Sequence, residues 1–169
     1  WFENLKNINP DKIRLLYVGR LRVEKGIFSL INILRDTNFS LTIITSEKNI
    51  ELKEKHENIN LMSFENYNDA IIDIYDKHSI FILPSYTEAH PQVLDEALAR
   101  CRPVIIFMEI DHVVRDRKGV FVCERNIKSL ENSINYINNN YENILSKIKT
   151  NKLPTKKNFI NELKEIIFN

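Results

Sequence analysis

Residues 80–97 read IFILPSYTEAHPQVLDEA, a stretch that joins an apolar run to a turn and then to a helical pattern. The four apolar residues at 80–83 are typical of a strand buried on both faces, and the proline-serine pair that follows ends it. Pro91 suits the first position of a helix, where its missing N–H costs no hydrogen bond. The first amides of that helix lack intrahelical partners and predict an anion site. Glu88 and Glu96 lie eight positions apart across this turn.

The same alternation of apolar runs and helical patterns continues on both sides of this stretch. Further strands are expected at residues 13–18, 41–45, 59–63, 103–107 and 120–123. Helices are expected at residues 27–34, 47–57, 68–77 and 91–100. This order predicts an α/β fold, a Rossmann-like, doubly wound parallel sheet of about six strands with helices on both faces. Ligands of such sheets bind at the carboxyl ends of the strands, where the turn at residues 84–91 and the loop at residues 19–26 both fall.

The carboxyl-terminal part of the chain is predicted to be helical. Residues 127–148 carry apolar side chains at helical spacing and predict one amphipathic helix, and a last helix is expected at 156–168. From residue 144 onward the chain has six lysines and two glutamates. Two interpretations stay open for these charges, a solvated face and an attraction to anionic lipid head groups.

Composition indicates an ordinary globular domain. The 169 residues are 43% apolar with a formal charge of +1, which suggests no nucleic-acid partner. No apolar run reaches the roughly 18 residues of a membrane span, and the first residues do not resemble a secretory signal, so a cytoplasmic location is expected. Cys101 and Cys123 are isolated in sequence and are expected to be buried free thiols.

Residues 19–26, GRLRVEKG, form a second candidate loop directly after the first expected strand. Gly19 and Gly26 are two of only three glycines in the chain, so the backbone is expected to approach something closely here. Arg20 can hold phosphate oxygens through two parallel hydrogen bonds, and Lys25 adds a compact positive charge. The alternative is that both are solvated loop charges. The sequence has no Asp-x-Asp segment that would bind a metal with a diphosphate.

Both segments resemble motifs of the retaining GT-B glycosyltransferases of family 4. Residues 88–96 are similar to the Glu-x7-Glu motif of that family, and residues 19–26 to its GRL-x-x-x-KG signature. Residues 97–105 resemble the run EALA…G-x-PVI, and the likeness extends over about residues 13–137. The resemblance implies the carboxyl-terminal, donor-binding half of a GT-B fold.

The resemblance also assigns roles to residues at the matching positions. Arg20 and Lys25 would balance the diphosphate and the charge that develops on it, without a metal. Glu88 would lie beside the transferred sugar, and these three are the catalytic candidates. Glu96 would accept hydrogen bonds from the ribose hydroxyls. The other residues expected to bind substrate are Gly19, Phe64, Ala89, His90, Pro91, Gln92 and Val93.

Structural interpretations stay open for four of these residues. Glu96 could be a salt-bridged residue on the flank of its helix, and Glu88 could complement the helix dipole as a capping acid. Phe64 follows the third expected strand and could stack on the base of the nucleotide, or it could belong to the core instead. His90 could be a surface residue with no contact to the donor.

The chain departs from the family pattern at three places. Ala89 and Cys101 stand where glycine is usual, and residues 107–112 lack the Gly-Gly pair that often follows the fifth strand. The methyl group of Ala89 narrows the approach to the sugar but leaves the backbone amide in place. Ala89 therefore concerns the identity of the donor sugar more than nucleotide binding, and the loop at 107–112 is expected to be shorter and differently shaped.

The expected organisation is a linker at 1–12, a donor-binding domain at 13–150, and a terminal helix at 151–169 that returns to an absent amino-terminal domain. The resemblance implies a UDP-sugar as donor substrate with no further cofactor, and a glycan or lipid-linked glycan acceptor of bacterial polysaccharide biosynthesis, such as O-antigen or lipopolysaccharide. The chain alone is expected to be inactive, in the cytoplasm or peripheral at the inner face of the membrane. The alternative is a non-catalytic nucleotide-binding or interaction module on a Rossmann-like fold. A dinucleotide-dependent oxidoreductase is disfavoured because no Gly-x-Gly-x-x-Gly occurs.

Overall fold

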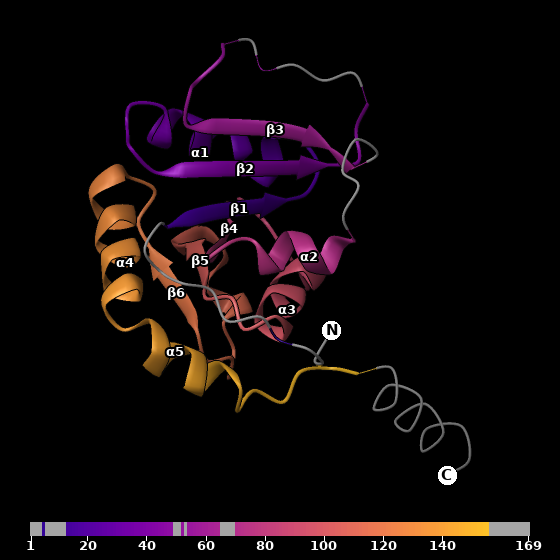
Figure 1. Cartoon of the computed structure of the whole chain (residues 1–169), viewed down its shortest axis with the longest axis vertical. Helices are drawn as coiled ribbons and strands as arrows, with labels where there is room; N and C mark the ends of the chain where they lie inside the picture. Colours follow the sequence, from indigo (N-terminus) through magenta and orange to yellow (C-terminus); the bar gives the residue numbers. More distant parts are fainter. Residues whose placement is uncertain (1–4, 6–12, 49–51, 53, 65–69, 156–169) are drawn as a thin grey trace.

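A single parallel sheet forms the centre of the molecule (Figure 1). The computed structural model describes residues 5, 13–48, 52, 54–64 and 70–155. The six strands lie in the order β3-β2-β1-β4-β5-β6, and each pairs with its neighbours in parallel. Their bounds are β1 Arg14–Val18, β2 Ser40–Thr45, β3 Ile59–Ser63, β4 Ile80–Leu83, β5 Val104–Phe107 and β6 Val120–Cys123. The predicted Rossmann-like α/β class is confirmed.

The order of the strands decides which face each helix covers. From β1 the chain moves outward to β3, returns to β4 beside β1, and then moves outward in the other direction to β6. Right-handed crossovers therefore place α1 (Ile27–Leu34) on one face and α2 (Ile71–Asp76) and α3 (Gln92–Ala99) on the other (Figure 1). The reversal between β1 and β4 opens a crevice at their carboxyl ends.

Two short 3-10 helices and two carboxyl-terminal helices complete the described part. The 3-10 helix η1 (Val23–Lys25) follows β1, and η3 (Met108–Val113) follows β5. Helix α4 (Ile127–Asn139) contacts β6 and is followed by α5 (Tyr141–Ile148). The elements that follow β1, β4 and β5 therefore meet at one edge of the sheet.

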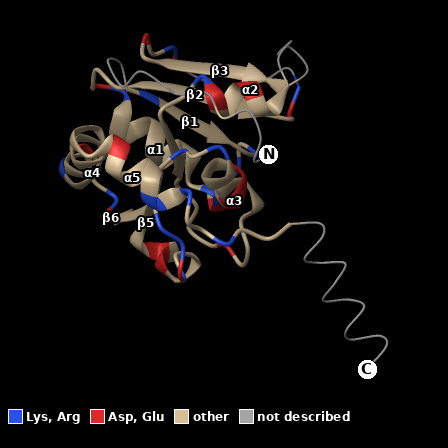
Figure 2. Ribbon diagram, turned by 60° about the horizontal axis from the view of Figure 1, so that its bottom comes forward, with Lys and Arg blue, Asp and Glu red and all other residues tan. Residues whose placement is uncertain are grey.

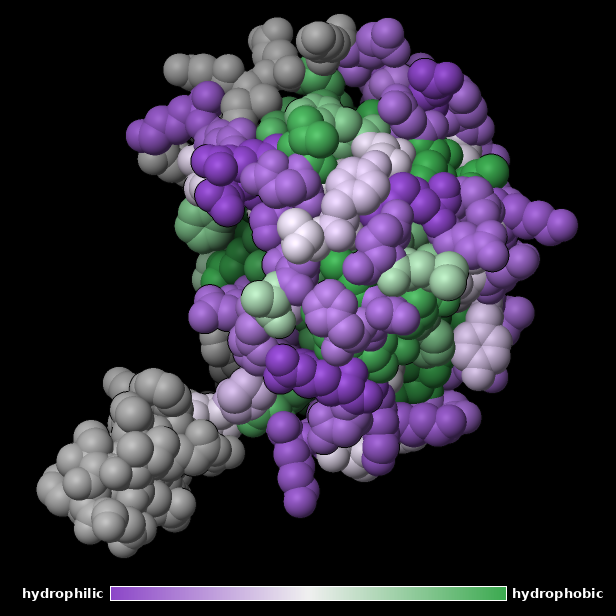
Figure 3. All heavy atoms as spheres, turned by 180° about the vertical axis from the view of Figure 1, so that it is seen from behind, coloured by the Kyte–Doolittle hydropathy of each residue, from purple (hydrophilic) through white to green (hydrophobic). Residues whose placement is uncertain are grey.

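The core is apolar and lies between the sheet and its helices. All residues of β4 and β5 are buried, as the continuous apolar runs predict for central strands. Figure 2 shows Lys, Arg, Asp and Glu distributed along the surrounding loops and helices. On the face seen in Figure 3, hydrophilic residues surround smaller apolar patches. No helix of the described residues is both long and apolar enough to cross a bilayer.

The prediction of a helix at 47–57 is wrong. The described residues of that segment are irregular, with bends and a turn but no helix, while 49–51 and 53 lie outside the described residues. The segment has only two apolar residues, too few for a helix face that packs on the sheet. The connection is held instead at Asn58, whose Nδ2 donates to the carbonyl oxygens of Leu34, Thr37 and Phe39 at 2.8, 2.9 and 3.1 Å.

The single helix expected at 127–148 is divided into α4 and α5. The break falls at Asn140, which has φ −121° and ψ 18° and ends a run of three asparagines with low helix propensity. Beyond it, the Tyr141 hydroxyl donates to the carbonyl oxygen of Ser79 at 2.9 Å, which holds α5 against the start of β4. The apolar period is retained across the break, since Leu130, Ile134 and Ile144 are buried.

Smaller differences concern the helix starts. Pro91 is the N-cap residue of α3 and not its first helical residue. Ala70 has an extended backbone and is the N-cap residue of α2. Within the described residues, the helix expected at 68–77 is therefore limited to Ile71–Asp76. The two cysteines are free and buried as predicted, and Cys101 adopts a left-handed backbone with φ 56° at the position where the family usually has glycine. The expected linker and terminal helix fall mostly outside the described residues.

Candidate functional site

The two motif loops pack directly on each other at the crevice. The backbone amide of Tyr86 donates to the carbonyl oxygen of Glu24 at 2.9 Å. Gly26 has φ 65°, and a Cβ atom at this position would overlap the carbonyl group of Pro84. The predicted close approach of the backbone is therefore confirmed, and its partner is the other motif loop.

Gly26→Ala is expected to destabilise the protein by about 2 kcal/mol, because it combines a left-handed backbone with an overlap against backbone atoms. Denaturant unfolding followed by circular dichroism measures this change. Asn32→Ala, on the exposed side of α1, serves as the control and should change the unfolding free energy by less than about 0.5 kcal/mol. Equal stability of Gly26→Ala and the unmodified chain would contradict the packing described here.

An ion pair joins the two loops across 63 positions of sequence. Lys25 Nζ donates to Glu88 Oε1 at 2.7 Å, and Ser85 Oγ donates to the same oxygen at 2.7 Å. The side chains of Lys25 and Glu88 are 24% and 11% exposed. The N-cap residue of α3 is Pro91 and not Glu88. Complementation of the helix dipole by Glu88 stays open beside its ion pair with Lys25. Lys25 is paired and is not a solvated loop charge.

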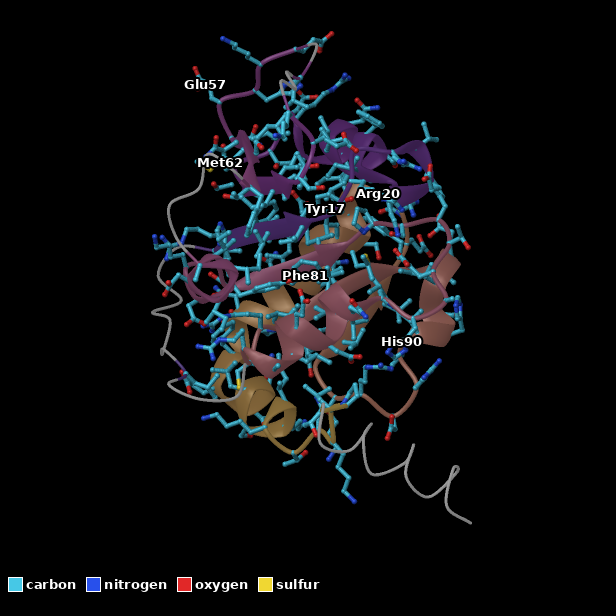
Figure 4. All side chains as sticks on the ribbon, turned by 90° about the vertical axis from the view of Figure 1, so that its right-hand side faces the viewer. Tyr17, Arg20, Glu57, Met62, Phe81 and His90 are labelled. Carbon is cyan, nitrogen blue, oxygen red and sulfur yellow. The ribbon has the colours of Figure 1, made fainter. Side chains whose placement is uncertain are left out.

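A hollow of about 320 Å³ lies beside this ion pair. Its lining contains eight of the residues predicted to bind substrate, namely Gly19, Arg20, Lys25, Glu88, His90, Pro91, Gln92 and Val93. Three predicted residues, Phe64, Ala89 and Glu96, are not part of the lining. Figure 4 shows Arg20 and His90 on the same side of the molecule. The hollow thus has two cations, one carboxylate and the start of a helix around one space.

Tyr17 is a residue of this hollow that the sequence analysis treats only as part of a strand. Its hydroxyl donates to the carbonyl oxygen of Arg20 at 2.8 Å. A Cβ atom on Gly19 would lie 2.6 Å from that hydroxyl, so Tyr17 explains the need for glycine there. Burial, followed by the charge of Glu88, raises the pKa of Tyr17, which keeps the hydroxyl a neutral donor. Its position at the end of β1, two residues before Gly19, is the signal that could have identified it.

Glu96 is held by a tyrosine instead of by the alternative salt bridge. The Tyr75 hydroxyl donates to Glu96 Oε2 at 2.9 Å, and no ion pair of Glu96 occurs among the described residues. Burial and the charge of Glu96 raise the pKa of Tyr75. The contact orients one carboxylate oxygen and leaves the half-buried side chain with further acceptor positions.

The other predicted residues have surroundings that limit their roles. Phe64 is 43% exposed just beyond β3, so it does not belong to the core. His90 Nε2 lies 3.5 Å from Asp95 Oδ2, and Asp95 also accepts two hydrogen bonds from Arg117 at 2.7 and 3.0 Å. Roles for Phe64 and His90 in ligand binding stay predictions.

The arrangement suits an anionic ligand that also carries hydroxyl groups. Arg20, Lys25 and the free amides at the start of α3 favour a diphosphate, while the Glu88 carboxylate can accept hydrogen bonds from hydroxyls. His112 and Arg125, which the sequence analysis does not single out, contact the loop that carries Glu88. No sequence pattern identifies either of them.

Comparisons with known proteins give one matching family and several similar proteins. The family model of the glycosyl transferases group 1 matches residues 3–153. One relative is TuaC of Bacillus subtilis strain 168, whose name describes it as a glycosyltransferase of teichuronic acid biosynthesis. It is 35% identical over 98 residues, which are 56% of this chain and 24% of TuaC. An uncharacterized glycosyltransferase of Haemophilus influenzae is 28% identical over 141 residues, or 76% of this chain and 40% of that protein.

The fold is similar to that of a solved structure. Sucrose-phosphate synthase from Thermosynechococcus elongatus matches with a TM-score of 0.70 at 17% identity, over 95% of this chain and 47% of that protein. At this identity the likeness concerns the fold alone. The chain spans less than half the length of each of these three proteins.

Proposed function

Because the chain belongs to the glycosyl transferases group 1, we propose that it forms the carboxyl-terminal, donor-binding half of a retaining, metal-independent glycosyltransferase of family 4. Its donor is a nucleoside-diphosphate sugar, with a UDP-sugar as the preferred candidate. The observation that carries this proposal is the meeting of Lys25 and Glu88, from loops 63 positions apart, at one hollow that Arg20 also lines.

Each part of the donor has a partner of suitable chemistry. Arg20 and the amides at the start of α3 bind the diphosphate, and Lys25 joins them when it exchanges Glu88 for a phosphate oxygen. Glu88 then accepts hydrogen bonds from the sugar. Glu96, oriented by Tyr75, accepts them from the ribose.

The proposed reaction is a front-face displacement. As the bond between sugar and phosphate breaks, Arg20 and Lys25 stabilise the charge on the leaving diphosphate. The leaving phosphate oxygen takes the proton of the acceptor hydroxyl on the same face of the sugar, so that the new bond retains the anomeric configuration. Glu88 stabilises the positive charge that develops at the anomeric carbon.

The acceptor is proposed to be a bacterial surface glycan or its lipid-linked precursor. The name of the relative TuaC, which refers to teichuronic acid biosynthesis, supports this proposal. Since the chain spans only part of its relatives, the acceptor site is assigned to the remainder of the enzyme, and these 169 residues are expected to bind donor without transferring sugar. Peripheral contact of the lysine-rich terminal segment with the membrane is part of the same proposal.

Calorimetric titration of the chain with UDP, GDP, UDP-glucose, UDP-N-acetylglucosamine and GDP-mannose tests the proposal. One nucleotide series is expected to bind, and Arg20→Ala should weaken that binding about tenfold or more, because a charged partner of the diphosphate is lost. Arg35→Ala, at an exposed pair with Asp36 on the end of α1, is the control. A chain that binds none of these ligands, or an Arg20→Ala variant that binds as before, would rule out the proposed site.

A further inference from the structure

Arg125 is a half-buried charge at the back of the candidate site, just beyond β6. Its Nε donates to Glu109 Oε1 at 2.7 Å, and its Nη2 lies 3.3 Å from the carbonyl oxygen of Ser85. The guanidinium also lies 4.0 Å from the ring centroid of Tyr86 and 4.3 Å from that of Phe107. One side chain thus contacts the loop after β4 and the start of the element after β5.

The first motif loop meets the same side chain. A Cβ atom on Gly26 would lie 3.1 Å from Arg125 Nη1, which places the guanidinium against the junction of η1 and α1. Arg125 therefore touches all three segments that follow β1, β4 and β5. The hydrogen bond from Arg125 lowers the pKa of Glu109, which keeps the ion pair charged at neutral pH.

Stability alone does not account for this arginine. Its side chain is 14% exposed, and Nη1 is buried without a hydrogen-bond partner among the residues that the structure describes. A buried charged donor without a partner is costly, and an apolar side chain could fill this space without that cost. The arrangement is explained if the arginine is retained for the geometry that it imposes on its neighbours.

The path from Arg125 to Glu88 is short. Arg125 fixes the carbonyl of Ser85, and the hydroxyl of the same serine donates to Glu88 Oε1. A second path runs through η3, since Glu109 holds that element to Arg125 while His112 Nε2 lies 2.8 Å from the Glu88 carbonyl oxygen and donates to it. Arg125 thus helps to position the carboxylate of Glu88 through Ser85 and the backbone of Glu88 through η3.

We propose that Arg125 is a positioning residue that holds the loop of Glu88 in place for the sugar part of the donor. This inference rests on the proposed function. Among the described residues, no hydrogen bond or ion pair joins Arg125 to the diphosphate partners Arg20 and Lys25. Loss of Arg125 should therefore affect binding of the sugar more than binding of the nucleotide diphosphate.

The experiment compares Arg125→Met and Arg125→Lys with the unmodified chain. UDP and the sugar nucleotide that binds best in the panel above are titrated against each, with Arg35→Met as the matched control. In Arg125→Met, the dissociation constant of the sugar nucleotide is expected to rise about tenfold and that of UDP less than about twofold. Arg125→Lys keeps the charge without the two-sided contacts and should give an intermediate ratio.

A ligand-free measurement separates this inference from the proposed function. Amide hydrogen exchange at Tyr86, which bonds the Glu24 carbonyl, should be about tenfold faster in Arg125→Met and unchanged in Arg35→Met. If Arg125→Met does not fold, Glu109→Gln, which removes the charge that holds the guanidinium, should accelerate the same exchange and shift the same affinity ratio.

Unchanged exchange at Tyr86 overturns the inference, whether or not any nucleotide binds. An equal loss of affinity for UDP and for the sugar nucleotide also overturns it, because a general structural role gives that result. Failure of the unmodified chain to bind any sugar nucleotide overturns the proposed function instead, and the exchange measurement then decides whether Arg125 holds the loop.

Discussion

Lys25→Met is expected to weaken the binding of UDP and the binding of UDP-sugars equally, by about 30-fold. Glu88→Gln is expected to strengthen UDP binding about threefold and to weaken only the binding of UDP-sugars. The opposite signs follow from the ion pair. Lys25 Nζ lies 2.7 Å from Glu88 Oε1 in the ligand-free site, so a diphosphate competes with Glu88 for this lysine. Removing the lysine removes a partner of the diphosphate, whereas removing the carboxylate charge removes its competitor.

Calorimetric titration of both variants with UDP and a UDP-sugar measures these changes. Lys147→Met, which removes an exposed lysine from the last turn of α5, is the control and should leave both affinities within about twofold. Weaker UDP binding in Glu88→Gln would contradict the competition and would indicate that the ion pair itself holds the site in its binding form.

Asp76→Ala is expected to have the largest effect on stability, a loss of about 3–5 kcal/mol. Arg100 donates to both carboxylate oxygens of Asp76 at 2.9 and 2.6 Å, and Arg102 Nη2 lies 3.3 Å from Oδ1. These three side chains are at most 2% exposed. The substitution leaves two buried guanidinium groups without their shared carboxylate.

Denaturant unfolding of Asp76→Ala measures this loss, which corresponds to a fall in melting temperature of about 10 °C for a domain of this size. Asp36→Ala is a matched control, because Asp36 pairs with Arg35 at 3.3 Å but is 86% exposed. Its effect should be below about 0.5 kcal/mol. A loss of less than about 1 kcal/mol in Asp76→Ala, close to the effect of ordinary surface substitutions, would show that the arginines find other partners.

The meeting of the two motif loops agrees with the predicted doubly wound fold. Residues 13–18 and 80–83 are recognisable as buried strands, and in a doubly wound sheet they become neighbours at the reversal of strand order. The structure pairs Leu15 with Ile80 and Leu16 with Phe81 in parallel. Whatever follows each strand must then lie at one edge, and Lys25 and Glu88 do so.

The local sequence predicts the structure of polar segments and the boundaries of helices less well. Residues 47–57 have helix-forming charges but too few apolar positions to bury, and tertiary contacts of Asn58 decide the path of the connection. Phe64, Ala89 and Glu96 were grouped with the site by resemblance, and the lining of the hollow does not include them. Their binding roles stay predictions.

Apolar periodicity and loop composition predict from the sequence which segments are strands and at which ends of the strands the two motif loops lie, because these signals act over a few neighbouring residues. The pairing of the charges, in contrast, comes from the packing of the folded chain. Glu88 joins Lys25, Asp76 joins Arg100, and Arg125 joins Glu109 across 63, 24 and 16 positions. Such pairs depend on the direction in which each side chain leaves its backbone and on the space that the packed core leaves for it, and neither is written in the spacing of residues along the chain.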